Sequence, residues 1–380
     1  MKKLLNKVWI IDGSYLLQRS LHVPELWELK SKKTGLRTGG AFGFLKSLNH
    51  EFKNLDYYPV VCWDAGLAPW RTSVYPMYKR FHIREAERMI RNKFNLNESA
   101  YQNEISDQSI IDEISQRFKG NSSALEEAIA SAKELLTQSR VDNSFLSDPD
   151  DFRAQYHRQR GVLINILNSI GVPSIRVNGW EGDDLMVLLQ RISNQSIIMT
   201  DDRDLIQMIA PNTDIIRPMQ KQHLVYNEYL KSENMDSPRE MVIIKAISGD
   251  GSDNIPAVTS GLERKYSLGA TRARTVAKII IENNEDREKY IPVLEGMNKN
   301  YYKGFIMRHD DYIRNMKLVD LSLVPNDENV INNIVGEVTS KAGKCNLMSA
   351  LGLLAEQEIT SFDINSFLSK MSVLSCGIRA

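Results

Sequence analysis

Short apolar runs recur along this chain, and several of them end at or just before an acidic residue. Segments of this length, bounded by turn residues, are typical of buried β-strands. Apolar residues at helical spacing follow several runs and predict helices, as Leu16, Leu17 and Leu21 do after the first run and Leu205, Met208 and Ile209 do after the run at residues 196–199. The predicted strands lie at residues 8–12, 59–64, 174–177, 196–199, 214–217 and 223–226. Strands that alternate with helices predict an α/β fold with a mostly parallel central sheet covered on both faces.

A long polar insertion separates the second predicted strand from the third. Its first part, residues 71–93, carries seven Lys and Arg against two Glu. Its second part, residues 97–151, carries four basic residues against twelve acidic ones. Residues 124–136 predict one helix there, whereas residues 120–123 and 147–150 predict breaks. We expect mobility in this second part rather than a hydrophobic core.

In the last third of the chain the strand pattern fades and helices are predicted instead. Residues 241–247 predict a short helix. A basic helix is predicted behind Gly269, with Arg272 and Arg274 in its first turn. The C-terminal stretch beyond it is predicted to be helical and carries no recognisable chemistry.

Composition and charge narrow the class of protein without deciding its partner. The chain has 380 residues, of which 42% are hydrophobic and 25% charged, as in a globular protein of two or three domains. Its 48 Lys and Arg balance 48 Asp and Glu, so net charge neither favours nor excludes nucleic acid. Cys62, Cys345 and Cys376 lack metal-site spacing, which indicates a reduced, cytoplasmic protein without a disulfide framework. No apolar run approaches the roughly 18 residues of a membrane span, and no signal peptide is recognised, so we expect no membrane partner.

An acidic turn at residues 245–256, KAISGDGSDNIP, carries the clearest candidate chemistry. Asp250 and Asp253 lie close together in it, and such a pair either caps the next helix or holds a hard cation. Four further acidic groups follow predicted strands. They are Asp12; Asp64; Glu181, Asp183 and Asp184; and Asp202 with Asp204. Since ligands bind beyond the carboxyl ends of parallel strands, we expect these groups to converge there.

Converged carboxylates are typical ligands for Mg²⁺ and Mn²⁺, which prefer oxygen. Five acidic groups brought together would repel one another unless cations compensate their charge. Two such ions about 4 Å apart are a common device for in-line displacement at phosphorus. Each group taken singly is also compatible with a simpler role, that of an acidic residue at a helix N-terminus.

The order and spacing of these groups resemble the 5′→3′ exonuclease and flap endonuclease family. The shared pattern is Asp-Gly after the first strand, Asp after the second, Glu-x-Asp-Asp, Thr-x-Asp-x-Asp and Lys-Ala-Ile-x-Gly-Asp-x-x-Asp-Asn-Ile-Pro. It extends over residues 5–93 and 150–320, and it is most similar to the free-standing phage enzymes of the T-even ribonuclease H and T5 5′ nuclease types. The resemblance implies a PIN-like or Rossmann-like sheet with a helical arch insertion and a C-terminal DNA-binding domain of helix-hairpin-helix type.

The resemblance also implies a division of the chain into domains. Residues 1–237 would form the metal-dependent nuclease domain, with the arch at residues 70–150. Residues 238–324 would form a helical domain that binds duplex DNA, and residues 325–380 a helical C-terminal extension. An extra stretch at residues 259–266 departs from the family pattern just before the Gly-rich hairpin.

Carboxylates at these family positions hold two Mg²⁺ ions, for which Mn²⁺ can substitute. The resemblance implies that the first ion is held by Asp12, Asp64, Glu181 and Asp183, and the second by Asp202, Asp204, Asp250 and Asp253. The residues implied in catalysis are Asp12, Asp64, Asp202 and Lys79. Asp201 matches a variable position of the family.

A Tyr-Lys pair, Tyr78 and Lys79, matches the base of the family's arch. This match implies that Lys79 contacts the scissile phosphate and that Tyr78 stacks on a base. The family places an arginine three residues after that lysine, where this chain has His82, and Arg84 follows; the replacement stays open between the two. The nucleic-acid-binding residues implied in all are Arg19, Tyr78, Lys79, Arg84, Lys245, Arg272 and Arg274.

The function implied is that of a Mg²⁺-dependent, structure-selective 5′-3′ exonuclease or flap endonuclease that removes RNA primers or 5′ flaps during DNA replication. It would act as a monomer in the cytoplasm, that of the host if the protein is phage-encoded. Its partners would be branched, flap or RNA-primed duplex DNA, with a single-strand-binding protein, a sliding clamp or a polymerase as protein partners. The acidic insertion would either shield the active site or bind a partner.

Three rival functions stay open at this point. A non-catalytic relative that binds branched DNA is disfavoured because no expected carboxylate is missing. A PIN-type ribonuclease is disfavoured by the length of the chain and by the basic helix at Arg272. A doubly wound small-molecule enzyme is disfavoured because no Gly-x-Gly-x-x-Gly loop follows the first strand.

Overall fold

The computed structural model describes residues 4–96, 107–140, 151–233, 235 and 237–378. Its contacts divide the chain into two compact units. The sheet unit comprises Met1–Ala68, Phe145–Pro238 and Leu321–Ala380, and the helical unit comprises Pro69–Ser144 and Arg239–Asp320. None of the described helices is long and apolar enough to cross a membrane. The three domain spans drawn from the family resemblance stay predictions.

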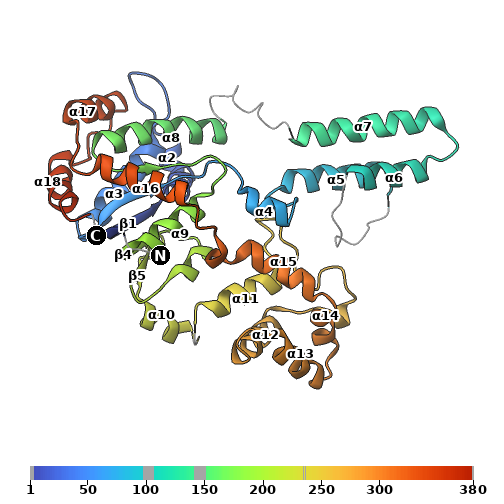
Figure 1. The fold of residues 1–380 in the computed structure, drawn as a ribbon. Coiled ribbons are helices and arrows are strands. Elements are labelled where there is room, and N and C mark those ends of the chain that lie inside the picture. The colour runs from blue at the N-terminus through green and yellow to red at the C-terminus, as the bar shows by residue number, and fades with distance from the viewer. Residues whose placement is uncertain (1–3, 97–106, 141–150, 234, 236, 379–380) are drawn as a thin grey trace. The chain divides into compact units, whose positions relative to one another are not determined.

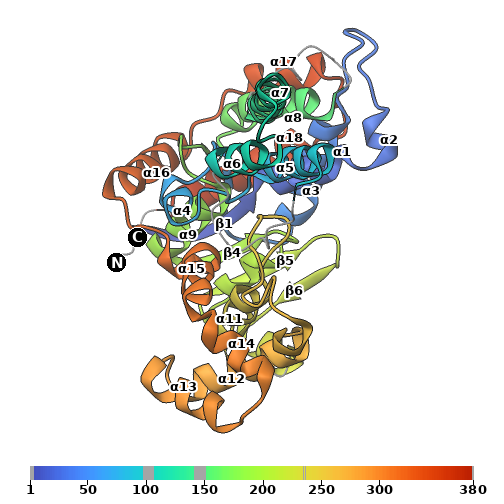
Figure 2. The ribbon, with the colours of Figure 1, turned by 90° about the vertical axis from the view of Figure 1, so that its right-hand side faces the viewer.

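The sheet unit is built on six strands in the spatial order β3-β2-β1-β4-β5-β6 (Figure 1). They are β1 Leu5–Asp12, β2 Tyr58–Cys62, β3 Ser174–Ile175, β4 Ser193–Met199, β5 Thr213–Arg217 and β6 Gln222–Leu224. The first five run parallel, and β6 pairs antiparallel with β5 as a hairpin at the edge of the sheet (Figure 2). The predicted mostly parallel sheet is therefore confirmed.

The central strand β1 is buried on both of its faces. Successive side chains of a strand point to opposite faces, and every residue from Val8 to Asp12 is buried. Trp9 stacks on Phe52 of helix α3 (Gly39–Phe52), with ring centroids 6.1 Å apart. Helix α9 (Gly182–Ile192) packs against β1, β2 and β4. A strand in this position has to be apolar throughout, which is why the sequence shows a continuous apolar run rather than an alternating one.

Helices surround the sheet. Helices α1 Gly13–Leu21 and α3 Gly39–Phe52 pack on each other, and α3 packs on α8 Phe152–Ser169. The other helices of the unit are α2 Pro24–Trp27, α9 Gly182–Ile192, α10 Tyr226–Glu233, α16 Glu328–Lys341, α17 Leu347–Glu356 and α18 Ile364–Ser375. The three C-terminal helices complete this unit, because α16 packs on α9 and β3, α17 on α8, and α18 on β2.

The segment after β4 departs from the α-helix predicted there. It forms only a short 3₁₀-helix, Asp204–Met208, and Ile209 is already extended with φ −59° and ψ 130°. Pro211 follows, and the residue before a proline is disfavoured in the α conformation, so the helix cannot lengthen. At its start, Asp202 Oδ1 accepts the backbone N–H of Asp204 at 2.8 Å. The predicted α-helix is therefore wrong at this position.

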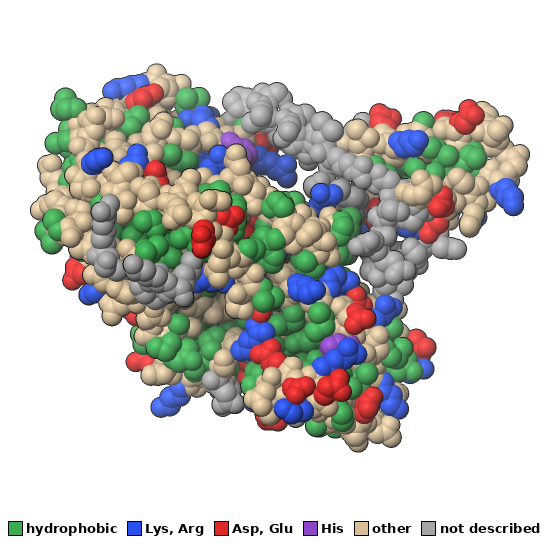
Figure 3. Space-filling model, viewed as in Figure 1, with side chains coloured by type: hydrophobic (Ala, Val, Ile, Leu, Met, Phe, Trp, Pro, Cys, Tyr) green, Lys and Arg blue, Asp and Glu red, His purple; other side chains and the backbone are tan. Residues whose placement is uncertain are grey.

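The helical unit contains α4 Pro69–Val74, α5 Phe81–Phe94, α6 Asp107–Arg117, α7 Ser122–Arg140, α11 Arg239–Ser248, α12 Ala270–Glu282, α13 Arg287–Gly296, α14 Asn300–Met307 and α15 His309–Val319. Helix α11 packs against both α12 and α15, around a core that includes Ile243, Val276 and Phe305. The predicted helices at residues 241–247 and behind Gly269 are confirmed. Acidic and basic side chains are interspersed on the face of this unit that Figure 3 shows.

The insertion has a hydrophobic core of its own, so the expectation of no core was wrong. Helix α7 runs alongside α5 and α6 (Figure 1), and Ile90 and Ile114 are fully buried among them. Arg91 is buried with them and pairs with Glu87 at 2.9 Å and with Glu113. Apolar residues recur here about once per helical turn among many charged ones, and the acidic composition hid that apolar stripe.

The local predictions for the insertion have different outcomes. The predicted helix at residues 124–136 lies within α7, and the predicted break at residues 120–123 overlaps the turn that precedes Ser122. The predicted break at residues 147–150 lies outside the described residues.

Candidate metal and nucleic-acid sites

Asp12 ends β1 and caps α1 in the sheet unit. Its Oδ1 accepts the backbone N–H of Tyr15 at 2.9 Å, and its Oδ2 accepts the hydroxyl of Thr200 at 3.0 Å. A Cβ on Gly13 would lie 2.8 Å from the carbonyl oxygen of Cys62, which is closer than real contacts allow. The Asp-Gly pair therefore lets the end of β2 approach the Asp12 carboxylate closely.

Asp64 is held between the first turns of two helices. Its backbone N–H donates to Ser14 Oγ at 3.0 Å, and its Oδ1 accepts the backbone N–H of Gly182 at 2.6 Å. A Cβ on Gly182 would lie 3.1 Å from that same oxygen, a tight contact that favours a glycine at this position. Glu181 caps α9 and forms a capping box with Asp184. Glu181 and Asp184 thus also have the simpler helix-terminal role.

The turn after β4 holds two neighbouring aspartates with different roles. Thr200 Oγ1 accepts the backbone N–H of Asp202 at 3.0 Å. Asp201 instead accepts two bonds on Oδ2, from the hydroxyl of Tyr15 at 3.2 Å and from the backbone N–H of Met219 at 3.0 Å. Asp201 therefore joins α1 to the turn between β5 and β6, a structural role that fits its variable position in the family pattern.

The carboxylates of the sheet unit act on one another electrostatically. Burial, and then the nearby carboxylates of Asp64 and Asp202, raise the pKa of Asp12 to about 7 in spite of its two hydrogen bonds. Burial and the charges of Asp12, Asp183 and Asp64 likewise raise the pKa of the Cys62 thiol. In the described part of the chain, no Lys or Arg forms an ion pair with Asp12, Asp64 or Asp202. The structure thus brings four predicted ligands within electrostatic reach, at the carboxyl ends of the strands.

The acidic turn of the helical unit follows α11. Two backbone hydrogen bonds between Asp250 and Ile255, at 2.8 and 2.7 Å, close the turn. Asp250 Oδ1 accepts the N–H and the hydroxyl of Ser252 at 2.8 and 2.6 Å, and Oδ2 lies 2.6 Å from Lys245 Nζ. Burial alone would raise the pKa of Asp250, but the bonds to Lys245 and Ser252 outweigh it and lower that pKa to about 2. Lys245, predicted to contact nucleic acid, is paired with a carboxylate in this structure.

Tyr78 and Lys79 contact the same turn through Asp253. The Lys79 backbone N–H donates to the Asp253 carbonyl at 2.8 Å, and the Tyr78 hydroxyl donates to Asp253 Oδ2 at 3.3 Å. Lys79 has φ 53°, a left-handed conformation that a lysine keeps only where its surroundings hold it. Tyr78 is 2% exposed, within the core of the helical unit. Base stacking by Tyr78 is therefore wrong for this structure, in which its hydroxyl positions Asp253.

Arg272 and Arg274 lie exposed in the first turns of α12. Gly269 caps this helix, and among the described residues no side chain caps its N-terminal N–H groups. The Arg272 guanidinium lies 4.1 Å from the centre of the Tyr301 ring, and Arg274 Nε lies 4.0 Å from Glu240. An uncapped helix start beside two arginines is suited to a backbone phosphate.

Two places where the chain departs from the family pattern lie in the helical unit. Arg84 and His82 lie in α5, but their side chains are outside the described residues, so the choice between them stays open. The extra stretch at residues 259–266 ends in a 3₁₀ turn, Arg264–Tyr266, that packs against α14.

Sequence comparisons show that this chain is similar to known nucleases. Residues 147–235 match the family described as 5'-3' exonuclease, N-terminal resolvase-like domain. The 5'-3' exonuclease of Aquifex aeolicus is 22% identical over 344 residues, which cover 89% of this chain and 94% of that protein. The 5'-3' exonuclease of Buchnera aphidicola subsp. Schizaphis graminum is 31% identical over 150 residues, which cover 37% of this chain and 51% of that protein.

This chain is similar in sequence to the 5′ nuclease family.

Some of the similar proteins contain the matched region within a longer chain. The thermostable DNA polymerase I of Thermus thermophilus is 30% identical over 124 residues, which are 32% of this chain but 14% of that protein. The Buchnera aphidicola and Thermus thermophilus relatives are thus matched over about half of their length or less, unlike the Aquifex aeolicus protein. A crystal structure of T5 D15 protein co-crystallized with metal ions has a TM-score of 0.48 and 16% identity, covering 89% of this chain and 99% of that one.

The carboxylates of the sheet unit form a donor set that fits a hard divalent cation. Asp12, Asp64, Asp183 and Asp202 offer only carboxylate oxygens, which Mg²⁺ and Mn²⁺ prefer. The raised pKa of Asp12 is the electrostatic sign of buried negative charge that lacks a positive partner. A bound divalent cation would supply that partner.

Two residues that support the carboxylates could not be anticipated. Ser14 bonds to the backbone of Asp64, 50 residues away, and Tyr15 bonds to Asp201, 186 residues away. A Ser and a Tyr at the start of a helix have no distinctive pattern, since their function depends on partners that only the fold brings near. Arg19, predicted to bind nucleic acid, lies in the last turn of α1 and lines a pocket of the sheet unit.

Proposed function

We propose that this protein is a structure-selective 5′-3′ exonuclease and flap endonuclease that hydrolyses phosphodiester bonds with two divalent cations. The observation that carries the proposal is the group of carboxylates at the carboxyl ends of the strands, where the pKa of Asp12 is raised to about 7. Similarity to 5'-3' exonucleases supports hydrolysis of nucleic acid. The proposed role is the removal of RNA primers or 5′ flaps during DNA replication.

The proposed cofactor is Mg²⁺, with Mn²⁺ as a substitute. Asp12, Asp64, Glu181 and Asp183 are the proposed ligands of the first ion. When bound, such ions supply an activated water and stabilise the leaving oxygen. Asp12 is partly protonated near pH 7 and must release its proton to become a ligand, because only the ionised carboxylate binds a cation. Cation binding is therefore coupled to proton release at this residue.

In the helical unit, Asp250 and Asp253 are the proposed carboxylates of the second ion. Both lie beside lysines, Asp250 with Lys245 at 2.6 Å and Asp253 with Lys79 at 3.8 Å. A cation at either carboxylate would have to displace or share the charge of its lysine. The longer distance makes Asp253 the easier of the two to engage.

Lys79 is proposed to stabilise the reacting phosphate. Its side chain is 32% exposed, and its Nζ lies 3.8 Å from Asp253 Oδ1, beyond ordinary hydrogen-bond length. The backbone bond from Lys79 to the Asp253 carbonyl fixes the point from which the side chain extends. An ammonium group placed in this way can turn to a phosphate and stabilise the charge that develops on it.

Helix α12 is proposed to bind the duplex part of the substrate. Arg272 and Arg274 are exposed in its first turns, and its N-cap residue, Gly269, offers no side chain to cap the N-terminal N–H groups. Such contacts go to backbone phosphates and carry no base sequence, so the recognition would depend on the shape of the substrate.

Cleavage of end-labelled substrates tests the proposed function. Nicked, 5′-flap and RNA-primed duplexes would be incubated with the protein in Mg²⁺, in Mn²⁺ or in chelator. We expect cleavage at or near the 5′ end in either metal and none in chelator. Binding without cleavage in both metals would favour the non-catalytic relative, and preferential cutting of single-stranded RNA would favour the PIN-type ribonuclease.

A further inference from the structure

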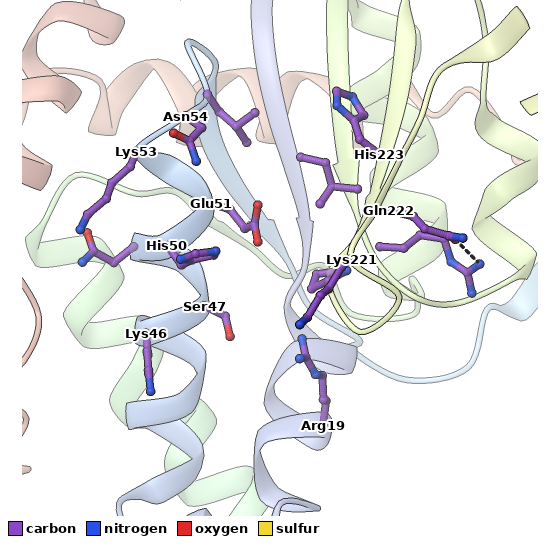
Figure 4. Close-up of a pocket in the computed structure, with 15 residues that line it drawn as sticks. Arg19, Lys46, Ser47, His50, Glu51, Lys53, Asn54, Lys221, Gln222 and His223 are labelled. Carbon is purple, nitrogen blue, oxygen red and sulfur yellow. Dashed lines mark hydrogen bonds between the residues drawn. The ribbon is translucent and has the colours of Figure 1, made fainter. Parts of the chain in front are cut away.

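A basic pocket lies on the sheet unit, beside the carboxylate group but distinct from it. Its volume is about 770 Å³, and its walls are the second half of α3, the end of α1 and the turn between β5 and β6 (Figure 4). The lining includes five Lys and Arg and a single acidic residue, Glu51. The basic residues are Arg19, Lys46, Lys53, Arg217 and Lys221. In a chain whose formal net charge is zero, such a concentration of one sign marks a site for an anion.

Two guanidinium groups that line the pocket have buried nitrogens without an acceptor among the described residues. They are Arg19 Nη1 and Arg217 Nε. The other contacts of Arg217, to the Asp201 carbonyl and to Gln222 Oε1, are both 3.4 Å long and therefore weak. A buried donor without an acceptor is unfavourable, so these groups point to an acceptor that a ligand brings. Guanidinium groups bind phosphate and carboxylate oxygens especially well.

The pocket is held in shape before any ligand arrives. Asp201 accepts bonds from Tyr15 of α1 and from Met219 of the β5–β6 turn, which fixes two of the walls relative to each other. Lys221 has φ 49° and points toward Arg19 in Figure 4. Two cationic side chains directed toward each other repel, and an anion between them removes that repulsion.

The size and lining of the pocket indicate which anion it takes. About two nucleotides of a single strand fit a volume typical of small-molecule sites, whereas a duplex does not. The lining holds no Phe, Tyr or Trp, and its five Lys and Arg outnumber its two aromatic rings, those of His50 and His223, so we expect most contacts to go to the phosphates of the backbone. Arg19 lies seven residues after Asp12 on the same helix, about 10 Å along its axis. A strand with a phosphate at Arg19 would therefore pass close to the carboxylate group.

We propose that this pocket binds a short single-stranded segment of the substrate through its phosphates. The proposal rests on the proposed nuclease function and adds a second contact for the same nucleic acid. A single nucleotide, an inorganic anion and an acidic peptide of a protein partner are the other occupants that the charge allows, and the test separates them.

Strand binding by lysine variants tests the proposal. The probe is a fluorescein-labelled oligothymidylate of about four nucleotides, with Ca²⁺ replacing Mg²⁺ to prevent cutting. The test variant is Lys46→Ala combined with Lys221→Ala, and the matched control is Lys344→Ala, an exposed lysine of the same unit outside the pocket. We expect the double variant to bind about tenfold more weakly. We also expect its log–log salt slope to flatten by roughly 1.4, which is about 0.7 for each lost phosphate contact on a single strand.

Competition identifies the occupant. Thymidine triphosphate, inorganic triphosphate and a glutamate-rich peptide would compete with the labelled strand. Weak competition by all three supports the proposal. Competition by either triphosphate as strong as that by unlabelled strand, or a peptide affinity that alone depends on Lys46 and Lys221, would overturn it.

Cleavage separates failure of the pocket from failure of the proposed function. At saturating enzyme in Mg²⁺, the double variant should cut a 5′-flap duplex at the wild-type single-turnover rate. Cutting by every variant with equal strand affinity and salt slope would overturn the pocket alone. A wild-type protein that never cuts, yet binds the strand through these lysines, would overturn the nuclease function and leave the pocket standing.

Discussion

The two groups of carboxylates in this molecule balance their charge in opposite ways. In the sheet unit, Asp12 is buried beside other carboxylates, and its pKa is raised to about 7. In the helical unit, Asp250 is paired with Lys245 at 2.6 Å, and its pKa is lowered to about 2. The same residue type thus carries an unfavourable charge in one unit and a stabilised charge in the other.

This difference indicates which group depends on a cation. The carboxylates of the sheet unit store electrostatic repulsion that a divalent ion would relieve, as expected of a metal site. The turn of the helical unit is complete without one, because lysines already compensate it. We therefore infer that the metal-free protein is weakened at the sheet unit and not at the acidic turn.

The largest effect is expected on cleavage when a carboxylate of the sheet unit loses its charge. Asp12→Asn and Asp202→Asn should each reduce the rate by about 10³-fold or more, because the proposed cation loses an anionic ligand. Asp201→Asn is the matched control, since an amide oxygen can still accept from Tyr15 and Met219; its rate should stay within about threefold of wild type. Normal turnover of both test variants at saturating Mg²⁺ would show that Asp12 and Asp202 are not ligands of a catalytic cation.

Lys79→Ala should produce the next largest effect. The loss of one contact to the charge that develops in the transition state is worth about 10² to 10³ in rate. Single-turnover cleavage at saturating enzyme should fall by that factor, while the affinity for a 5′-flap duplex in Ca²⁺ changes little. A variant that lost only affinity would place Lys79 among ordinary basic surface residues.

Arg272→Ala and Arg274→Ala should weaken duplex binding moderately and independently of sequence. Each removes one phosphate contact, so the log–log salt slope should flatten by roughly one unit per variant. Affinity against salt would be measured on duplex and on single-stranded probes in Ca²⁺. An equal loss on single strands, or an unchanged slope for both, would mean that α12 does not bind duplex.

The stability of the metal-free protein should fall as pH rises toward neutrality. The folded pKa of Asp12 lies above the ordinary value of 3.8, so the folded state holds a proton that the unfolded chain releases between about pH 4 and 7. Urea denaturation in chelator should show a loss of about 4 kcal/mol over that range, since each unit of pKa difference corresponds to about 1.4 kcal/mol. Asp12→Asn should abolish this loss, and the variant should be more stable than wild type at pH 7.5. If wild type and Asp12→Asn lost stability equally with rising pH, buried Asp12 would not carry the unfavourable charge described for the sheet unit.

Asp250→Asn should show the smallest effect, with the opposite sign. The folded pKa of Asp250 is lowered, so its contribution is present above about pH 4 and is lost as pH falls toward 2. Removing the charge should destabilise the protein at pH 7 by about 1 kcal/mol and leave Lys245 without its partner. Stabilisation by this substitution would show that the two carboxylate groups do not differ as described.

The sequence was sufficient to predict the sheet and the carboxylates at its edge, because both depend on local patterns. A continuous apolar run followed by Asp12-Gly13 indicates a buried strand and a close turn without knowledge of the rest of the fold. The 3₁₀-helix at Asp204–Met208 was missed although Pro211 was visible, since the apolar spacing there also suits an α-helix.

Pairings between distant residues were beyond sequence reasoning. Tyr78 was predicted to stack on a base, but the core of the helical unit buries it and only its hydroxyl reaches Asp253. The pairing of Lys245 with Asp250 also follows from the geometry of the turn rather than from residue types. The basic pocket is formed by α1, α3 and the β5–β6 turn, which are far apart in the sequence. No continuous run of basic residues therefore predicts it.

Proton release on Mg²⁺ binding tests the central claim, that buried carboxylates of the sheet unit hold a divalent cation. Calorimetric titration at pH 7 in two buffers of different ionisation enthalpy gives the number of protons released per ion. With a pKa of about 7, Asp12 is about half protonated, so wild type should release roughly half a proton and Asp12→Asn almost none. Mg²⁺ binding by wild type without proton release, or equal release by Asp12→Asn, would contradict the claim.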